Sequence, residues 1–142
     1  MRATLILLIC IAYSPKLISQ HNAPTPLVKI VVEAMLENPR IRAARYVSAE
    51  TSGVFFRHNE YEIEGNAHGV AYKIWPDKNL FMYVIKYYFN FTRMEITDDK
   101  INAEYQTITE YNYPKGKDIN GVIVLEKDGD NWIVTKHKIN GP

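Results

Sequence analysis

The stretch from Arg93 to Ile139 constrains the fold most, because it has the pattern of four β-strands joined by turns. Within Ile101–Tyr111, apolar and polar residues alternate at the two-residue period of a half-buried strand. Ile119–Glu126 and Trp132–Ile139 are the next strands, and a tight hairpin at Asp128–Asp130 joins them. Strands joined so closely run antiparallel, because a parallel neighbour needs a connection of about a dozen residues or more.

Two segments ahead of this sheet have the pattern of helices. Thr25 is suited to cap a helix and Pro26 to begin one, and apolar residues then recur at helical spacing from Leu27 to Met35. Asn38-Pro39 repeats the signal, so we predict a second, shorter helix over about Arg40–Val47. Helices with one apolar stripe need a surface to cover. The sequence therefore predicts an α+β fold in which N-terminal helices pack on the sheet.

The middle of the chain is less regular. Val54–Phe56 has the composition of a short buried strand, and Arg57–Glu64 is polar enough to be the return arm of an exposed hairpin. Gly65–Ile74 is expected to be helical, since its apolar residues gather on one side of a helix. Asn79–Phe91 fits a buried helix and an interior strand equally well, and we favour a helix up to Tyr87 followed by a strand.

The start of the chain has the composition of a secretory signal peptide, because Arg2 precedes the apolar run Leu5–Ala12. This run is shorter than the roughly 20 residues that span a membrane as a helix. We therefore expect residues 1–19 to be a cleaved leader, a retained signal anchor being the alternative. Residues 20–142 are then one extracellular domain. Cys10 is the only cysteine, so this domain has neither disulfides nor cysteine ligands for zinc.

Several classes of function lack their usual sequence signals. The chain carries 17 basic and 16 acidic residues, without a basic cluster interleaved with aromatics. We therefore expect no nucleic-acid partner, and no membrane partner after leader cleavage. No two histidines have helical i, i+4 spacing, and neither a glycine-rich phosphate loop nor a Gly-x-Ser-x-Gly motif occurs. The expectation is no metal and no cofactor.

Two short features remain candidates for modification or chemistry. Asn90-Phe91-Thr92 is an N-glycosylation sequon, which a secreted chain would present to the transferase; the alternative is that Asn90 lies in a folded strand. His137 alternates with Ile133, Thr135 and Ile139 along the last strand. It is either a base facing an internal cavity or a histidine at the sheet margin between two lysines.

The order of these elements resembles that of the NTF2-like superfamily, also called the cystatin-like α+β cone. The ending Lys127–Val134 is similar to the "dG-x-W-x-I" close of many such domains. The resemblance implies a strongly curved antiparallel sheet around helices, with a cone-shaped apolar pocket. Members include isomerases, dehydratases, ligand carriers and protein-interaction modules. We expect the pocket to be lined by Phe55, Val84, Tyr105, Trp132 and His137.

Two functions follow from this interpretation. The first is a secreted, non-enzymatic domain that binds a hydrophobic small molecule or a protein partner, with a homodimer among the expected assemblies. The second is an isomerase or lyase that uses His137 or a buried aspartate as base and a tyrosine as hydrogen-bond donor. The first is favoured, because the Asp or His–Asp pair with Tyr that such enzymes place in the cone does not align with residues of this chain.

Overall fold

The computed structural model describes residues 25–48, 51–58, 62–75, 85–110 and 118–141. In these residues, helices α1 (Thr25–Met35) and α2 (Pro39–Ala43) precede the strands. The strands are β1 (Tyr46–Val47), β2 (Ser52–Arg57), β3 (Ile63–Ala67), β4 (Val70–Trp75), β5 (Tyr87–Ile96), β6 (Lys100–Thr109), β7 (Asn120–Asp128) and β8 (Asn131–Asn140). No helix in this part of the chain has the length and apolar character needed to cross a bilayer.

All strands belong to one sheet with the order β3-β4-β2-β5-β6-β7-β8, and β1 pairs with β2. The run from β5 to β8 is antiparallel, as the sequence predicts. The sheet as a whole is mixed, however, since β2 runs parallel to both β4 and β5. The expectation of an antiparallel sheet throughout is therefore wrong. Residues 58–69 connect β2 to β4, and residues 58–86 connect β2 to β5. Connections of this length permit parallel pairing.

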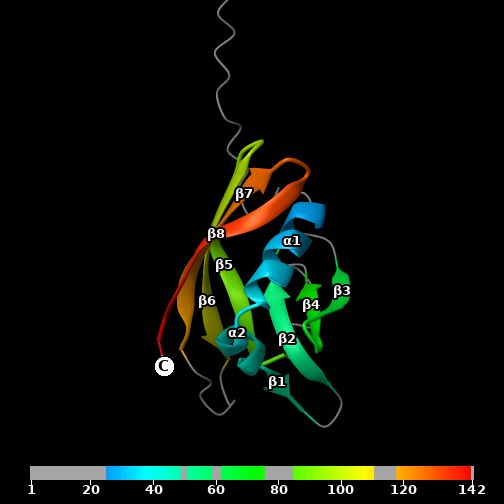
Figure 1. The fold of residues 1–142 in the computed structure, drawn as a ribbon. Coiled ribbons are helices and arrows are strands. Elements are labelled where there is room, and N and C mark those ends of the chain that lie inside the picture. Colours follow the sequence, from blue (N-terminus) through cyan, green and yellow to red (C-terminus); the bar gives the residue numbers. More distant parts are fainter. Residues whose placement is uncertain (1–24, 49–50, 59–61, 76–84, 111–117, 142) are drawn as a thin grey trace, which may run out of the picture.

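Two irregularities in pairing accompany the strong curvature of the sheet (Figure 1). In β5, Thr92 is an extra residue between the pairs made by Phe91 and Arg93. In β8, Thr135 is an extra residue opposite the step from Val124 to Leu125. Bulges of this kind bend a strand and increase its twist. The structure thus confirms an α+β fold with a strongly curved sheet.

Helix α1 lies within the curve, with β7 and β8 on one side and β3 and β4 on the other (Figure 1). Its buried side chains include Val28, Val31, Val32 and Met35, all without solvent exposure. Burying one such side chain contributes about 1.5–3 kcal/mol to stability. The apolar stripe therefore fixes which face of α1 points to the sheet, and its remaining face borders the groove described below.

Three predictions for the middle of the chain are wrong. The helix expected over Arg40–Val47 ends at Ala43, and Tyr46–Val47 forms β1. The segment Gly65–Ile74 is not helical, and Arg57–Glu64 is not the return arm of a hairpin with β2. Instead, β3 and β4 form a hairpin with each other.

The turn at His68-Gly69 explains this hairpin. Both residues have positive φ, 52° and 74°, as a type I′ turn requires, and this turn suits the twist of a two-residue hairpin. Along β4, Val70, Tyr72 and Ile74 are buried at the two-residue period of a strand.

The predictions for Val54–Phe56 and for the ending are correct, since these residues lie in β2 and in β5 to β8. Strand β5 begins at Tyr87, where the sequence predicted the end of a helix. The rest of that predicted helix lies mostly in residues 76–84, outside the described part of the chain. Residues 1–24, with the predicted leader, also lie outside it.

Candidate functional site

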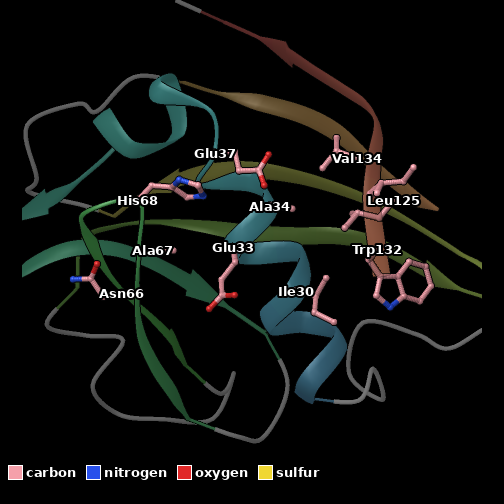
Figure 2. A pocket seen from close by; sticks show the side chains of 11 residues that line it. Ile30, Glu33, Ala34, Glu37, Asn66, Ala67, His68, Leu125, Trp132 and Val134 are labelled. Carbon is pink, nitrogen blue, oxygen red and sulfur yellow. The ribbon is translucent and has the colours of Figure 1, made fainter. Parts of the chain in front are cut away.

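A groove of about 610 Å³ lies between α1, the β3–β4 hairpin and the β7–β8 hairpin (Figure 2). We call it the α1–β8 groove. Its apolar lining residues are Ile30, Ala34, Ala67, Leu125, Trp132, Ile133 and Val134. Its polar lining residues are Glu33, Glu37, Asn66 and His68. The groove is open to solvent along one side and brings together three segments that are distant in sequence.

The β8 side of the groove exposes apolar surface. Val134 is 37% exposed and pairs directly with Leu125, which is buried. Ile133 is 46% exposed but pairs with Glu126, so its side chain points to the opposite face of the sheet. In the described residues, the only other large apolar side chain with such exposure is Val47, at 63%. The Nζ atom of Lys127 lies 5.8 Å from the ring centroid of Trp132, within the range of a cation–π contact. Trp132 and Val134, two residues apart on the same face of β8, therefore form the apolar wall of this groove.

The α1 side of the groove carries a fixed carboxylate. The hydroxyl of Tyr72 donates a hydrogen bond of 2.7 Å to Oε1 of Glu33. Burial, and next the hydrogen bond to Glu33, raise the pKa of Tyr72 above its ordinary value. Tyr72 pairs directly with Gly65 across β3 and β4, and its ring occupies the space that a side chain at Gly65 would need. The glycine thus lets the tyrosine cross β3 and reach the helix.

A second polar contact lies on the other flank of the sheet, where Tyr105 and His137 meet. The Tyr105 hydroxyl lies 2.7 Å from Nε2 of His137. Burial raises the pKa of Tyr105, an effect that the charge of Arg40 opposes, and burial also lowers the pKa of His137. A neutral phenol and a neutral imidazole result near pH 7, and the tautomer of the imidazole decides which of the two groups donates in this hydrogen bond.

The β-bulge at Thr135 and the absence of a side chain at Gly121 make the contact between Tyr105 and His137 possible. Because Thr135 is extra, His137 pairs with the buried Ile123 and faces the core. Tyr105 pairs with Gly121, and its hydroxyl would be 2.5 Å from a Cβ built on that glycine. The phenol therefore lies over Gly121 and reaches β8. Strict alternation along β8 would place His137 on the same face as Ile133. The extra residue Thr135 moves His137 to the opposite face, which is the core side.

A smaller hollow of about 230 Å³ lies beside β2, β3 and β4. Phe55 and Trp75 line it, with their ring centroids 5.5 Å apart. Lys73 lies at its edge, where its Nζ atom contacts the carboxylates of Glu62 at 2.6 Å and Glu64 at 2.7 Å. Both aromatic rings are more than 90% buried, so this hollow offers less apolar contact area than the α1–β8 groove.

The five residues expected to line one pocket lie in different places. Trp132 lines the α1–β8 groove, and Phe55 lines the smaller hollow. Tyr105 and His137 contact each other but are absent from the described lining of both. Val84 lies outside the described residues.

The sequence pattern alone did not indicate the polar side of the groove. Glu33 and Glu37 lie on and just after α1, and His68 lies in the β3–β4 turn. A helical Gly65–Ile74 would place His68 on a helix surface rather than in a turn beside α1. The available signal was His68-Gly69 between two alternating segments, which is typical of a two-residue hairpin.

The sequon asparagine lies inside the sheet. Asn90 is half-buried in β5, and its direct partners are Gln106 on β6 and Arg57 on β2. Asn90 alternates with the buried Phe89 and Phe91, so its side chain lies on the face opposite to the core. Modification of Asn90 therefore stays a prediction of the sequence.

The face of the sheet that points away from α1, which we call the outer face, is lined by ion pairs. The Nζ atom of Lys100 lies 3.5 Å from Glu126, and the guanidinium of Arg93 contacts both Glu95 and Glu104. Over the described residues, no group of three or more metal-ligating side chains gathers in one place. The described part of this face is charged rather than apolar.

Comparisons with known proteins were made for the whole chain. No protein-family model matches it, and neither the curated proteins nor the solved structures include a match. Its function is therefore inferred from the geometry of this chain alone.

Proposed function

We propose that the chain is a secreted binding domain with an NTF2-like cone, and that it binds a small hydrophobic molecule in the α1–β8 groove. The observation that carries this proposal is the apolar surface of Trp132 and Val134, which is exposed inside a groove rather than on a flat face. Contiguous exposed apolar surface in a hollow is typical of a ligand site. The volume of about 610 Å³ lies within the range of roughly 300–1,000 Å³ that small-molecule sites have.

Ligand binding is favoured over a protein partner on the open sheet. A protein interface has an apolar, uncharged centre, whereas the outer face between β5 and β7 carries Arg93, Glu104, Lys100 and Glu126. Strand β8 forms an edge of the sheet, but its bulge and the exposed Lys136 and Lys138 discourage pairing with a second copy.

Binding of a neutral fluorescent probe, N-phenyl-1-naphthylamine, tests this proposal. The wild-type chain is expected to bind it with enhanced fluorescence, and Val134→Asp is expected to weaken binding about tenfold or more, since a charge enters the apolar side. Val47→Asp is the matched control, because Val47 is also exposed but lies outside the groove. Equal binding by both variants and the wild type would place the probe elsewhere and refute the proposal.

Secretion and glycosylation form a separate part of the proposal. Expression of the full chain in eukaryotic cells is expected to release a product that begins near Gln20. A mobility shift on glycosidase treatment, abolished by Asn90→Gln, would show that the sequon is occupied. A chain that stays inside the cell with Met1 retained would contradict the leader.

An isomerase or lyase is the second candidate, and the contact between Tyr105 and His137 is the observation in its favour. It ranks lower because Tyr105 is only 2% exposed and a raised pKa makes its phenol a weak acid. Proton exchange at the α-carbon of cyclic enones in deuterated water, followed by NMR, tests it. Exchange that His137→Gln abolishes would support the enzyme, and exchange no faster than in buffer would remove this candidate for that substrate class.

A further inference from the structure

We propose that the α1–β8 groove takes an amphipathic organic cation, with its apolar body on β8 and its ammonium group facing Glu33 and Glu37. This inference rests on the ligand binding proposed above and adds the charge of the ligand. It depends on how charge is distributed around the groove.

The formal charges on the described lining of the groove are all negative. With histidine neutral, they are the carboxylates of Glu33 and Glu37, and no described lysine or arginine lines the groove. Figure 2 shows both glutamates on the helix side, across from Trp132 and Val134. A carboxylate only accepts hydrogen bonds, so the polar end of a complementary ligand must donate them.

Tyr72 holds the first of these carboxylates in place. Its hydroxyl donates to Oε1 of Glu33 at 2.7 Å, and its ring is 3% exposed against Gly65. The Glu33 side chain itself remains 41% exposed. An acceptor that is oriented before the ligand arrives loses less entropy on binding.

The cations near the groove each contact another group. Lys29 is exposed one helical turn before Glu33, with Nζ 3.9 Å from its Oε1. Arg42 donates from Nη1 to the backbone carbonyls of Leu36 and Glu37, both at 2.7 Å. Lys127 lies over the Trp132 ring. An anionic ligand would therefore meet two carboxylates without a lysine or arginine among the described lining residues, whereas a cation finds acceptors.

The end of α1 adds to the negative potential. The helix ends at Met35, and its last carbonyl groups carry a partial negative charge of about half an elementary charge. Glu37 follows this end directly. Arg42 offsets part of the effect at Leu36 and Glu37, so the carboxylates make the larger contribution to charge preference.

Two amphiphiles of equal chain length test the inference. Decyltrimethylammonium and decanoate, each below its micelle-forming concentration, compete with N-phenyl-1-naphthylamine at neutral pH. The cation is expected to displace the probe at about tenfold lower concentration, as two partly exposed carboxylates would produce. High salt is expected to reduce this ratio, because exposed charges are screened.

Three variants locate the effect. Glu37→Gln and Glu33→Gln are each expected to lower the ratio about threefold. Glu33→Gln keeps an amide oxygen that accepts from Tyr72, which preserves the fold. Glu104→Gln, on the outer face of β6, removes the same charge and is expected to leave the ratio unchanged.

The outcomes separate this inference from the proposed function. If the neutral probe does not bind, ligand binding in the groove is refuted. If it binds and the two amphiphiles compete equally, or decanoate competes better, only the charge preference is overturned. A preference that Glu104→Gln lowers as much as Glu37→Gln would reflect net charge and would also overturn the inference.

Discussion

Two tyrosines lie over glycines on opposite flanks of the sheet, and they differ in what they reach. Tyr72 lies over Gly65 and donates to Glu33 on α1, whereas Tyr105 lies over Gly121 and contacts His137 within the sheet. The first pair fastens the helix and shapes the groove. The second fastens the edge strand β8 to the middle of the sheet.

The space around the two glycines also differs. A Cβ on Gly121 would lie 2.5 Å from the backbone carbonyl of Lys138 as well as 2.5 Å from the Tyr105 hydroxyl. The three atoms nearest to a Cβ on Gly65 would all belong to the Tyr72 side chain. Backbone in a paired strand cannot move without breaking its pairing, but a ring can turn away. Gly121 is therefore required by its neighbouring strand, and Gly65 only by a side chain.

The largest effect is expected for Gly121→Ala. The new methyl group overlaps a backbone carbonyl that β7–β8 pairing holds in place, so the strands must separate or Tyr105 must leave the core. A loss of about 3 kcal/mol in the free energy of unfolding is expected, the upper part of the range for overpacked sites. Urea denaturation followed by circular dichroism measures it. A change within error of zero would mean that β8 moves freely at this point.

Gly65→Ala is expected to have a smaller effect of about 1–2 kcal/mol, because only the Tyr72 ring has to turn. That turn breaks the hydrogen bond to Glu33 and changes the groove wall, so probe binding is expected to weaken as well. The double variant Gly65→Ala with Tyr72→Ala removes the overlapping ring. If Gly65→Ala is as damaging in that background as in the wild type, the ring is not the cause.

Local hairpins and long-range contacts also differ in how far the sequence predicts them. The β5–β6 and β7–β8 hairpins have short turns and alternating residues, so local pattern determined them. Strand β2 between β4 and β5 depends on pairing with residues far along the chain, which periodicity does not encode. The two β-bulges change which side chains face the core, and this is why alternation groups His137 with Ile133 although the two lie on opposite faces.

The groove was predicted only in part, for the same reason. Trp132 was found because aromatic residues in a final hairpin suit a pocket. Glu33 and Glu37 look like ordinary solvent-facing positions of an amphipathic helix. Only the contact between α1 and the β3–β4 hairpin makes them part of a site, and that contact depends on Tyr72 crossing Gly65.

Tyr105→Phe is expected to destabilise the chain by about 1 kcal/mol, because the half-buried imidazole of His137 loses its partner. Probe binding in the groove is expected to be unchanged, since Tyr105 does not line it. Tyr72→Phe should instead weaken probe binding through Glu33. Thermal denaturation and probe titration of both variants test the difference, and equal effects on binding would remove the distinction between the two flanks.

The smallest expected effect is on how stability depends on pH. Of the two tyrosine contacts, only that between Tyr105 and His137 is expected to make stability fall at acid pH. Burial lowers the pKa of His137 in the folded state, so the unfolded chain binds the proton more readily. Stability from this group is full above the ordinary histidine pKa of about 6.5 and is lost as pH falls through the lowered value. His137→Gln should flatten this acid limb, and Tyr72→Phe should not.

On the alkaline side both tyrosines act alike. Their pKa values are raised in the folded state, so the unfolded chain ionises first and stability falls as pH rises above about 10. Urea titrations at pH 5, 7 and 10.5 separate the two limbs. If the stability of His137→Gln still falls at acid pH, other groups cause that fall. The two tyrosine contacts would then differ in geometry but not in titration.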